Sequence, residues 1–239
     1  MNIKDRMIIA LDYSDPKDAK EIVERLGDAA SFYKVGLELF LNSKGEMVEY
    51  LTEKGKKVFL DLKFHDIPNT TTMASIFAAK KNVFMFNVHS GGGKKMMKSV
   101  AEKAREINPE TLAIGVTVLT SFSEEDIRET YMSELSLKDL ALNLAKITKE
   151  AGMDGVVCSP WEAKYVKEVC GEEFKTVCPG VRPRWSVAND QERIMTPKYA
   201  IMNGCDYLVV GRPITKHENP QVAAEMVLAE IEEGLKGKC

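Results

Sequence analysis

Eight short apolar runs, separated by longer amphipathic stretches, recur along the whole chain and constrain its fold more than any other feature. The runs are rich in Val, Ile, Leu and Phe and mostly end in Gly, Asp, Ser or His, which is typical of buried parallel strands. They cover residues 7–12, 32–36, 57–64, 84–89, 112–118, 154–159, 175–180 and 206–211. Eight strand–helix alternations in 239 residues predict an α/β fold, a (β/α)8 (TIM) barrel, with residues 1–239 forming a single domain.

The stretches between the runs carry helix signals. Residues 16–26 begin at Pro16, which suits the first turn of a helix, and they follow Asp15, whose side chain can cap it. Residues 136–151 place leucine and isoleucine near a helical period, and the last stretch begins at Pro220 and runs nearly to the end. An open doubly wound sheet is the alternative fold. The first turn after a strand, DYSDPKD, lacks the Gly-x-Gly-x-x-Gly pattern that the alternative fold often carries.

The longest irregular stretch covers residues 181–195 and reads VRPRWSVANDQERIM. It lies between the seventh apolar run and the helix that should follow it. Loops of this length inside compact domains usually carry function or cover a site. We therefore expect a functional loop or a lid at this position.

The charge balance limits the partners that the chain can have. It contains 33 basic and 36 acidic residues, a net charge of −3, whereas a protein held to nucleic acid by bulk charge is basic with clustered Lys and Arg. No apolar run approaches the roughly 18 residues of a membrane span, and the apolar start is too short for a secretory signal. The five cysteines form no Cys-x-x-Cys pair, and the three histidines show no metal spacing. These features predict a cytoplasmic protein with reduced thiols that binds no nucleic acid, membrane or metal.

Charged residues gather where the first three strands should end. Asp12 ends the first run, Lys34 lies in the second, and the third reads DLKFHD, with Asp61, Lys63 and then Asp66 in the following turn. Strand alternation places Asp61 and Lys63 on one side, facing the barrel interior near its mouth. Charges are rarely buried unless they are paired, so Lys34, Asp61, Lys63 and Asp66 should form an alternating cluster. A structural salt-bridge network is the alternative, but buried ion pairs stabilise a fold only weakly, which favours a chemical role.

A second group of residues could bind a small anion. Gly211 and Arg212 follow the eighth run, the usual phosphate corner of such a barrel, and the long seventh loop adds Arg182 and Gln191. Arginine can grip a phosphate through two hydrogen bonds, glutamine can donate an amide N–H, and glycine lets the backbone approach the oxygens. The sequence therefore predicts a local cationic phosphate site in spite of the negative net charge.

Short motifs along the chain resemble those of one enzyme family. DLKFHDIPNT, at residues 61–70, is similar to the signature of the orotidine 5′-phosphate decarboxylase family. The same family is matched in the same order by ALDY (10–13), YKVGLELF (33–40), VTVLTS (116–121), DGVVCS (154–159), CPGVR (178–182), ANDQ (188–191) and VVGRPITK (209–216). The resemblance covers essentially the whole chain, and the Asp-x-Lys-x-x-Asp pattern is specific in this setting.

The resemblance implies decarboxylation of orotidine 5′-monophosphate to uridine 5′-monophosphate (UMP) without a cofactor, the final step of de novo pyrimidine synthesis. In that family the lysine of the second strand, here Lys34, joins the charged residues of the signature in an alternating array. Lys63 is then the proton donor to C6, and Asp61 lies beside the departing carboxylate and helps to hold Lys63. Asp66 and Thr70 are expected to reach into the neighbouring subunit's site, which makes the working unit a homodimer.

The resemblance also implies contacts with the substrate. Asp12 and Lys34 are expected to contact the ribose hydroxyls, and Thr120 the pyrimidine ring. The 5′-phosphate is expected to bind Arg182, Gln191, Gly211 and Arg212.

Three other functions remain open. A metal-dependent sugar-phosphate enzyme resembling 3-keto-L-gulonate 6-phosphate decarboxylase shares the signature pattern, but it has an acidic metal ligand on the second strand, where Lys34 would repel Mg²⁺. An aldolase could use Lys63 to form a Schiff base with a carbonyl substrate. A catalytically silent sensor of a phosphorylated ligand is the alternative outside the enzymes, although every charged position of the signature is intact.

Overall fold

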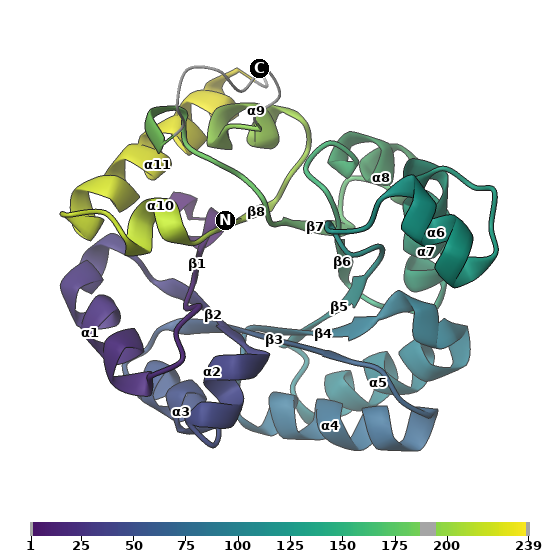
Figure 1. The fold of residues 1–239 in the computed structure, drawn as a ribbon. Coiled ribbons are helices and arrows are strands. Elements are labelled where there is room, and N and C mark those ends of the chain that lie inside the picture. Colours follow the sequence, from purple (N-terminus) through teal and green to yellow (C-terminus); the bar gives the residue numbers. More distant parts are fainter. Residues whose placement is uncertain (1, 187–194, 238–239) are drawn as a thin grey trace.

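Eight parallel strands close into a barrel in the computed structural model, which describes residues 2–186 and 195–237 (Figure 1). Each strand pairs with its neighbours in chain order, and β1 closes the ring by pairing with β8. The strands are β1 (Met7–Ala10), β2 (Phe32–Gly36), β3 (Lys57–Phe64), β4 (Met85–His89), β5 (Leu112–Val116), β6 (Gly155–Val157), β7 (Lys175–Cys178) and β8 (Tyr207–Val210). The closed order confirms the predicted (β/α)8 barrel and excludes an open doubly wound sheet.

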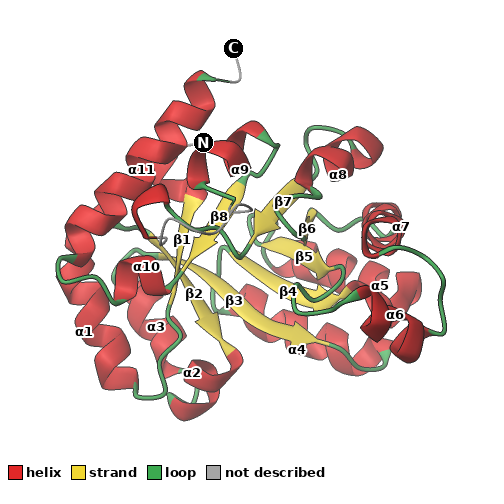
Figure 2. Ribbon diagram, turned by 45° about the horizontal axis from the view of Figure 1, so that its top comes forward, coloured by secondary structure: helices red, strands yellow, loops and turns green. Residues whose placement is uncertain are grey.

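Helices surround the barrel on its outside (Figures 1 and 2). The α-helices are α1 (Pro16–Leu26), α2 (Leu37–Asn42), α3 (Glu46–Glu53), α4 (Pro68–Lys80), α5 (Gly93–Ile107), α6 (Glu124–Tyr131), α7 (Leu137–Glu150), α8 (Ala163–Cys170), α9 (Pro197–Met202), α10 (Arg212–Thr215) and α11 (Pro220–Lys236). Short 3-10 helices are η1 (Ile3–Arg6), η2 (Gly27–Ala29), η3 (Ser90–Gly92) and η4 (Arg184–Ser186). In the part of the chain that the structure describes, no helix is both long enough and apolar enough to cross a membrane.

The predicted elements lie where the sequence places them, and most strands stop short at their carboxyl ends. The run 7–12 ends as a strand at Ala10 and the run 206–211 at Val210. The residues just beyond, Asp12 and Gly211, leave the hydrogen-bonded ladder and surround the mouth of the barrel. Because these strands end early, the residues that follow them lie outside the hydrogen-bonded sheet and line the candidate site.

Local sequence explains helix α1 well. The Asp15 side chain accepts a hydrogen bond from the Lys17 N–H at 2.8 Å, and Pro16 occupies the first helical position. The helix then buries one apolar face against the barrel: Ala19, Ile22, Val23 and Leu26.

The lower part of the barrel interior is filled by apolar side chains. Every second residue of a strand points inward, and the inward residues form one buried cluster: Ile8, Ala10, Phe32, Phe59, Met85, Ile114, Val177, Tyr207 and Val209. At the amino ends of the strands Phe32, Phe84 and Tyr207 meet edge to face, with ring centroids 5.1 to 6.2 Å apart. The interior is therefore a packed core at this end and not a channel.

The next inward-facing layer is polar. Two positions beyond the apolar layer, toward the carboxyl ends of the strands, the same alternation reaches Asp12, Lys34, Asp61 and Asn87. Because apolar side chains fill the interior below this polar layer, the polar chemistry of the interior is confined to the barrel mouth.

The cysteines within the described residues are buried free thiols: Cys158, Cys170, Cys178 and Cys205. Burial raises the pKa of the Cys170 thiol. This state agrees with the reduced thiols that the sequence predicts, and Cys239 lies outside the described residues.

Candidate active site

Four charged side chains form a continuous series of ion pairs at the mouth of the barrel. The Lys34 ammonium lies 3.0 Å from Asp12 Oδ1 and 3.3 Å from Asp61 Oδ2. The Lys63 ammonium lies 2.7 Å from the other carboxylate oxygen of Asp61, Oδ1. Charge therefore alternates from Asp12 through Lys34 and Asp61 to Lys63, and we call these four residues the charge array.

The charge array is buried at its centre and open at its ends. The side chains of Lys34 and Asp61 are each 12% exposed, whereas those of Lys63 and Asp12 are 37% and 67% exposed. Charges this deeply buried are costly unless each has a partner, and here each has one. Lys63 thus combines a fixed anionic partner with access from outside.

The two buried members of the array are held in their charged forms. Burial alone lowers the pKa of Lys34, but the carboxylates of Asp61 and Asp12 outweigh burial and raise this pKa above its ordinary value. Burial alone raises the pKa of Asp61, but the ammonium groups of Lys34 and Lys63 outweigh burial and hold this pKa below its ordinary value. At neutral pH the site therefore presents fixed charges of opposite sign side by side.

The backbone of β3 departs from a regular strand at Lys63. Register pairs with β4 on either side of this point are Leu60 with Phe86 and Phe64 with Val88. Residues 61–63 therefore face the single position of Asn87, and Lys63 has a φ of +51°, in the left-handed region. Plain strand alternation, the basis on which Asp61 and Lys63 were expected to share a side, is wrong for this segment. The two side chains do meet, but across a bulge with an unusual backbone.

Asn87 is the residue at this site that sequence reasoning missed. Its side chain is fully buried, accepts a hydrogen bond from the Lys63 N–H at 2.8 Å, and donates one to Asp61 Oδ1 at 2.7 Å. A signal for it exists, since Asn87 is the polar residue within the otherwise apolar run FMFNV. A polar side chain in a buried strand needs a partner, and this one has two.

A cavity of about 280 Å³ opens beside the charge array. Asp61 and Lys63 line it together with Asp12, Lys34 and residues that follow β1 and β2. Both lysine ammonium groups therefore stand at the wall of a space that a small molecule can enter.

A second cavity, of about 220 Å³, lies on the other side of Lys34. Its lining includes Arg182, Gly211 and Arg212, and it shares Asp12 and Lys34 with the first cavity. The predicted phosphate residues that the structure describes thus come together next to the charge array. The fourth of them, Gln191, lies outside the described residues.

Asp66 and Thr70 do not join the charge array of their own chain. Both are exposed, and the Asp66 carboxylate accepts a hydrogen bond from the neighbouring Ile67 N–H at 2.6 Å. Within residues 2–186 and 195–237 no ion pair or hydrogen bond connects Asp66 to Lys63. The predicted cluster of four is therefore a cluster of three within one chain, extended by Asp12. Thr120 is exposed in the turn between β5 and α6.

Exposed apolar side chains lie close in the chain to Asp66 and Thr70 and also on α2. They lie on α2, on α4 and on the turn before α4, and Phe40 of α2 meets Phe77 of α4 edge to face at 6.0 Å. The most exposed large side chains are Leu37, Leu41, Ile67, Met73 and Phe77. Several large apolar side chains exposed on neighbouring elements are typical of a protein interface. We call this surface the α2/α4 face.

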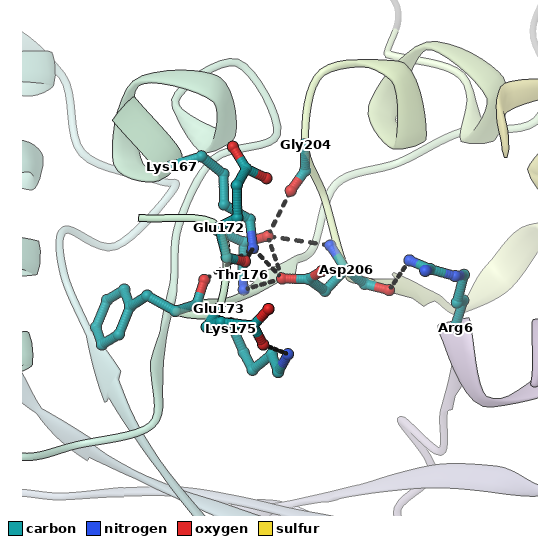
Figure 3. A network of polar contacts seen from close by, with 9 residues as sticks. Arg6, Lys167, Glu172, Glu173, Lys175, Thr176, Gly204 and Asp206 are labelled. Carbon is teal, nitrogen blue, oxygen red and sulfur yellow. Dashed lines mark hydrogen bonds and ion pairs between the residues drawn. The ribbon is translucent and has the colours of Figure 1, made fainter. Parts of the chain in front are cut away.

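A different lysine–aspartate pair lies at the opposite, amino end of the strands (Figure 3). The Lys167 ammonium lies 2.6 Å from Asp206 Oδ2 and also donates to the main-chain oxygens of Glu172 and Phe174 at 2.7 and 2.9 Å. The same Asp206 oxygen accepts from the Thr176 N–H at 2.9 Å. Each of the three ammonium protons has an acceptor, so we regard this floor network as a structural connection between α8, β7 and β8.

A larger cavity, of about 880 Å³, lies outside the barrel between α8 and α9. Trp161, Tyr165 and Tyr199 line it, and Lys167 reaches its wall. Because the Lys167 ammonium is already saturated, this cavity offers no buried charge to a ligand. The chemistry of the molecule is concentrated in the smaller cavities at the mouth.

The described residues contain no group of three His, Cys, Asp or Glu side chains placed to hold a metal ion. At the mouth itself, Lys34 and Lys63 occupy the positions beside Asp61. Two ammonium groups around one carboxylate form a poor environment for a cation.

Comparison with known proteins gives a consistent result. The sequence profile described as "Orotidine 5′-phosphate decarboxylase / HUMPS family" matches residues 5–227. The orotidine 5′-phosphate decarboxylase of Syntrophomonas wolfei is 43% identical over 98% of this chain and all of that protein, and that of Carboxydothermus hydrogenoformans is 45% identical over 98% and 99%. The crystal structure of orotidine 5′-phosphate decarboxylase from Lactobacillus acidophilus superposes with a TM-score of 0.85 at 38% identity, covering 94% of this chain and 98% of that one. The chain therefore belongs to the orotidine 5′-phosphate decarboxylase / HUMPS family.

Proposed function

We propose that the protein converts orotidine 5′-monophosphate to UMP and CO₂, the final step of de novo pyrimidine synthesis, without a cofactor. The observation that carries the proposal is the Asp61 carboxylate held between two lysines, one of which, Lys63, lines a cavity. Family membership and the names of the relatives support the same reaction.

The chemical problem of this reaction is the charge that develops on the pyrimidine ring. When the bond between C6 and the carboxylate breaks, its electron pair stays on C6 in an orbital that the π-system of the ring does not stabilise. A fixed cation aimed at that position supplies the kind of electrostatic stabilisation that usually contributes most to catalysis. The Lys63 ammonium, held 2.7 Å from Asp61, is such a cation.

Lys63 is also the proton source in this proposal. The electron pair on C6 takes a proton from the Lys63 ammonium, which forms the C6–H bond of UMP and leaves Lys63 as a neutral amine. Water then returns the proton to Lys63. Its side chain is 37% exposed, which makes reprotonation from solvent possible once the product has left.

Asp61 has two tasks in the proposed mechanism. Its Oδ1 fixes the Lys63 ammonium, and its own negative charge lies beside the carboxylate that departs. As the reaction proceeds, negative charge leaves the neighbourhood of Asp61 and moves toward Lys63. The array therefore favours the transition state over the bound substrate.

The second cavity suits the phosphate end of the nucleotide. Arg182, Gly211 and Arg212 line it, and we assign the 5′-phosphate to them, with Gln191 as a fourth partner by resemblance. The remaining contacts are Asp12 and Lys34 to the ribose hydroxyls and Thr120 to the pyrimidine ring. Binding energy at the phosphate, remote from C6, can then order the site around the reacting carbon.

We further propose that the working unit is a homodimer that pairs through the α2/α4 face. The supporting observation is that Asp66 and Thr70 lie close in the chain to exposed apolar side chains and leave the array of their own chain. A two-fold interface would bring the same surface of a second copy against them. Asp66 and Thr70 would then complete the partner's site.

The test is a spectrophotometric assay of orotidine 5′-monophosphate with the purified protein, with and without EDTA. We expect loss of substrate and formation of UMP at the same rate in both conditions. Loss of activity in EDTA would favour the metal-dependent sugar-phosphate decarboxylase, and trapping of a carbonyl substrate by borohydride would favour the aldolase. Tight binding of the nucleotide without turnover would favour the silent sensor.

A further inference from the structure

Asn87 occupies the one position of β4 that stands opposite the bulge in β3. Three residues of β3, 61–63, share this single partner position, so the regular ladder is interrupted at Lys63. The acceptor of the Lys63 N–H is the side-chain oxygen of Asn87, at 2.8 Å. The side chain of Asn87 thus replaces the missing rung of the sheet.

The other end of the same amide reaches the charge array. Asn87 Nδ2 donates to Asp61 Oδ1 at 2.7 Å, the oxygen that also accepts from the Lys63 ammonium at 2.7 Å. One side chain therefore binds the Lys63 backbone on one side and the counter-ion of the Lys63 ammonium on the other. It is completely buried, at 0% exposed, and touches neither mouth cavity.

The chemistry of the two partners fixes which atom of the amide points where. A main-chain N–H requires an acceptor, and an ionised carboxylate requires a donor. A carboxamide satisfies both at once, whereas an ionised carboxylate, an apolar side chain or a cation at this position leaves one partner opposed or unpaired.

We propose that Asn87 is a positioning residue for the proton transfer: it holds Lys63 in its left-handed backbone conformation and holds the Asp61 oxygen that aims the Lys63 ammonium into the cavity. The inference rests on the role of Lys63 in the proposed function. A φ of +51° is unfavourable for lysine, and the hydrogen bond from the Lys63 N–H to Asn87 holds it in this conformation within the strand. The Asn87 hydrogen bond also contributes to the low pKa of Asp61, after the larger effect of the two lysines.

The first test is Asn87→Leu, which keeps the size of the side chain and removes both hydrogen bonds. We expect kcat for orotidine 5′-monophosphate to fall by about 10- to 100-fold, the usual scale for a lost hydrogen bond to a charged group. Because Asn87 does not touch the cavities, KM and the Kd for UMP should stay within about twofold of wild type. A purely structural role would lower the folded fraction and leave kcat per folded molecule unchanged.

The second test is Asn87→Asp, whose protonation state can be controlled. A protonated carboxyl accepts from the Lys63 N–H and donates to Asp61, as the amide does, whereas an ionised carboxylate opposes the charge of Asp61. The ratio of variant to wild-type kcat should therefore rise at least about tenfold as the pH falls through the pKa of the shared proton. A ratio that stays flat across the pH range in which the introduced carboxyl is seen to titrate would contradict the proposal.

The matched control is Ser90→Ala, which removes another buried hydrogen bond near the end of the same strand. Ser90 Oγ lies 2.8 Å from Thr148 Oγ1, on the helix side and outside the array. This variant should lose some stability and keep its kcat.

Amide hydrogen exchange at Lys63 measures the same connection without any substrate. In Asn87→Leu we expect the Lys63 amide to exchange at least about tenfold faster, while Ser90→Ala leaves it unchanged. Unchanged exchange together with wild-type kcat would overturn the role of Asn87. A wild-type protein that leaves orotidine 5′-monophosphate intact would instead overturn the proposed function, and the exchange result would still decide whether Asn87 holds Lys63.

Discussion

Lysine–aspartate pairs stand at both ends of this barrel, and they use their hydrogen-bonding capacity in opposite ways. At the floor, the Lys167 ammonium has one carboxylate and two main-chain carbonyls as acceptors, and its side chain is 6% exposed. At the mouth, Asp61 serves two ammonium groups, and Asp61 Oδ1 is the one acceptor for Lys63 within the described residues. The floor lysine is saturated, whereas the mouth lysine retains donors that face a cavity.

The difference shows how to separate a structural ion pair from a reactive one. Distance does not separate them, since the closest contacts are 2.6 Å at the floor and 2.7 Å at the mouth. The two pairs differ in whether the lysine ammonium has donors left and whether it faces a cavity. A cation whose protons are all engaged has none to offer to a substrate. The mouth array also lies on an unusual backbone, as functional sites often do, whereas the floor network uses ordinary strand ends.

The largest expected effect is the loss of turnover in Lys63→Ala. Removing both the cation and the proton donor should lower kcat by at least about 10⁴-fold. The free energy of unfolding should change by no more than about 1 kcal/mol, because the side chain is partly exposed and Asp61 keeps its ion pair with Lys34. Steady-state kinetics and urea unfolding measure the two quantities, and a near-normal kcat would refute the proton-donor role.

A substitution in the floor network should have the opposite effect, with a large loss of stability and little loss of turnover. Lys167→Met leaves the largely buried Asp206 without its counter-ion and two carbonyls without their donor, which should cost about 3–5 kcal/mol of unfolding free energy. Its kcat per folded molecule should stay within about twofold of wild type, because the network lies at the far end of the strands. A selective loss of kcat with normal stability would show that the floor takes part in catalysis.

Arg212→Ala tests whether the second cavity at the mouth binds the phosphate while the charge array carries the chemistry. Loss of a charge-assisted contact to the phosphate should raise KM by about 30- to 100-fold, with a smaller effect on kcat. The matched control is Arg184→Ala, which removes an exposed arginine of the loop after β7 that does not line the cavity. An unchanged KM in Arg212→Ala would show that the phosphate binds elsewhere.

Mixed dimers test whether the mouth is completed by a second chain. Asp66→Ala and Lys63→Ala are each expected to be inactive alone. If Asp66 serves the partner's site, a heterodimer of the two variants contains one intact site, so random mixing should restore about a quarter of the wild-type rate. No recovery, with exchange of subunits verified by mass, would show that the site is not shared.

Much of this molecule can be predicted from its sequence, because the relevant signals are local. Eight apolar runs predict the closed barrel, and the charges at the ends of these runs predict most of the array. Asp15 and Pro16 likewise predict the start of α1.

The remainder depends on contacts between distant residues. The bulge at Lys63 involves a hydrogen bond from the Lys63 N–H to Asn87 in the next strand. Neither residue by itself predicts a bulge. Lys167 reads as one more charge on an amphipathic helix, and only the folded chain places it against Asp206. The sequence predicts Asp66 within the cluster because it follows Lys63 by three positions in the signature. In the structure, the turn after the bulge places Asp66 at the surface.

Measuring kcat and the free energy of unfolding for Lys63→Ala and Lys167→Met side by side tests the difference between the two networks most directly. We expect a crossed result, in which the mouth variant loses turnover and keeps its stability while the floor variant loses stability and keeps its turnover. If both variants lose stability and turnover together, or if Lys63→Ala keeps its turnover, the distinction between a reactive and a structural lysine–aspartate network is wrong.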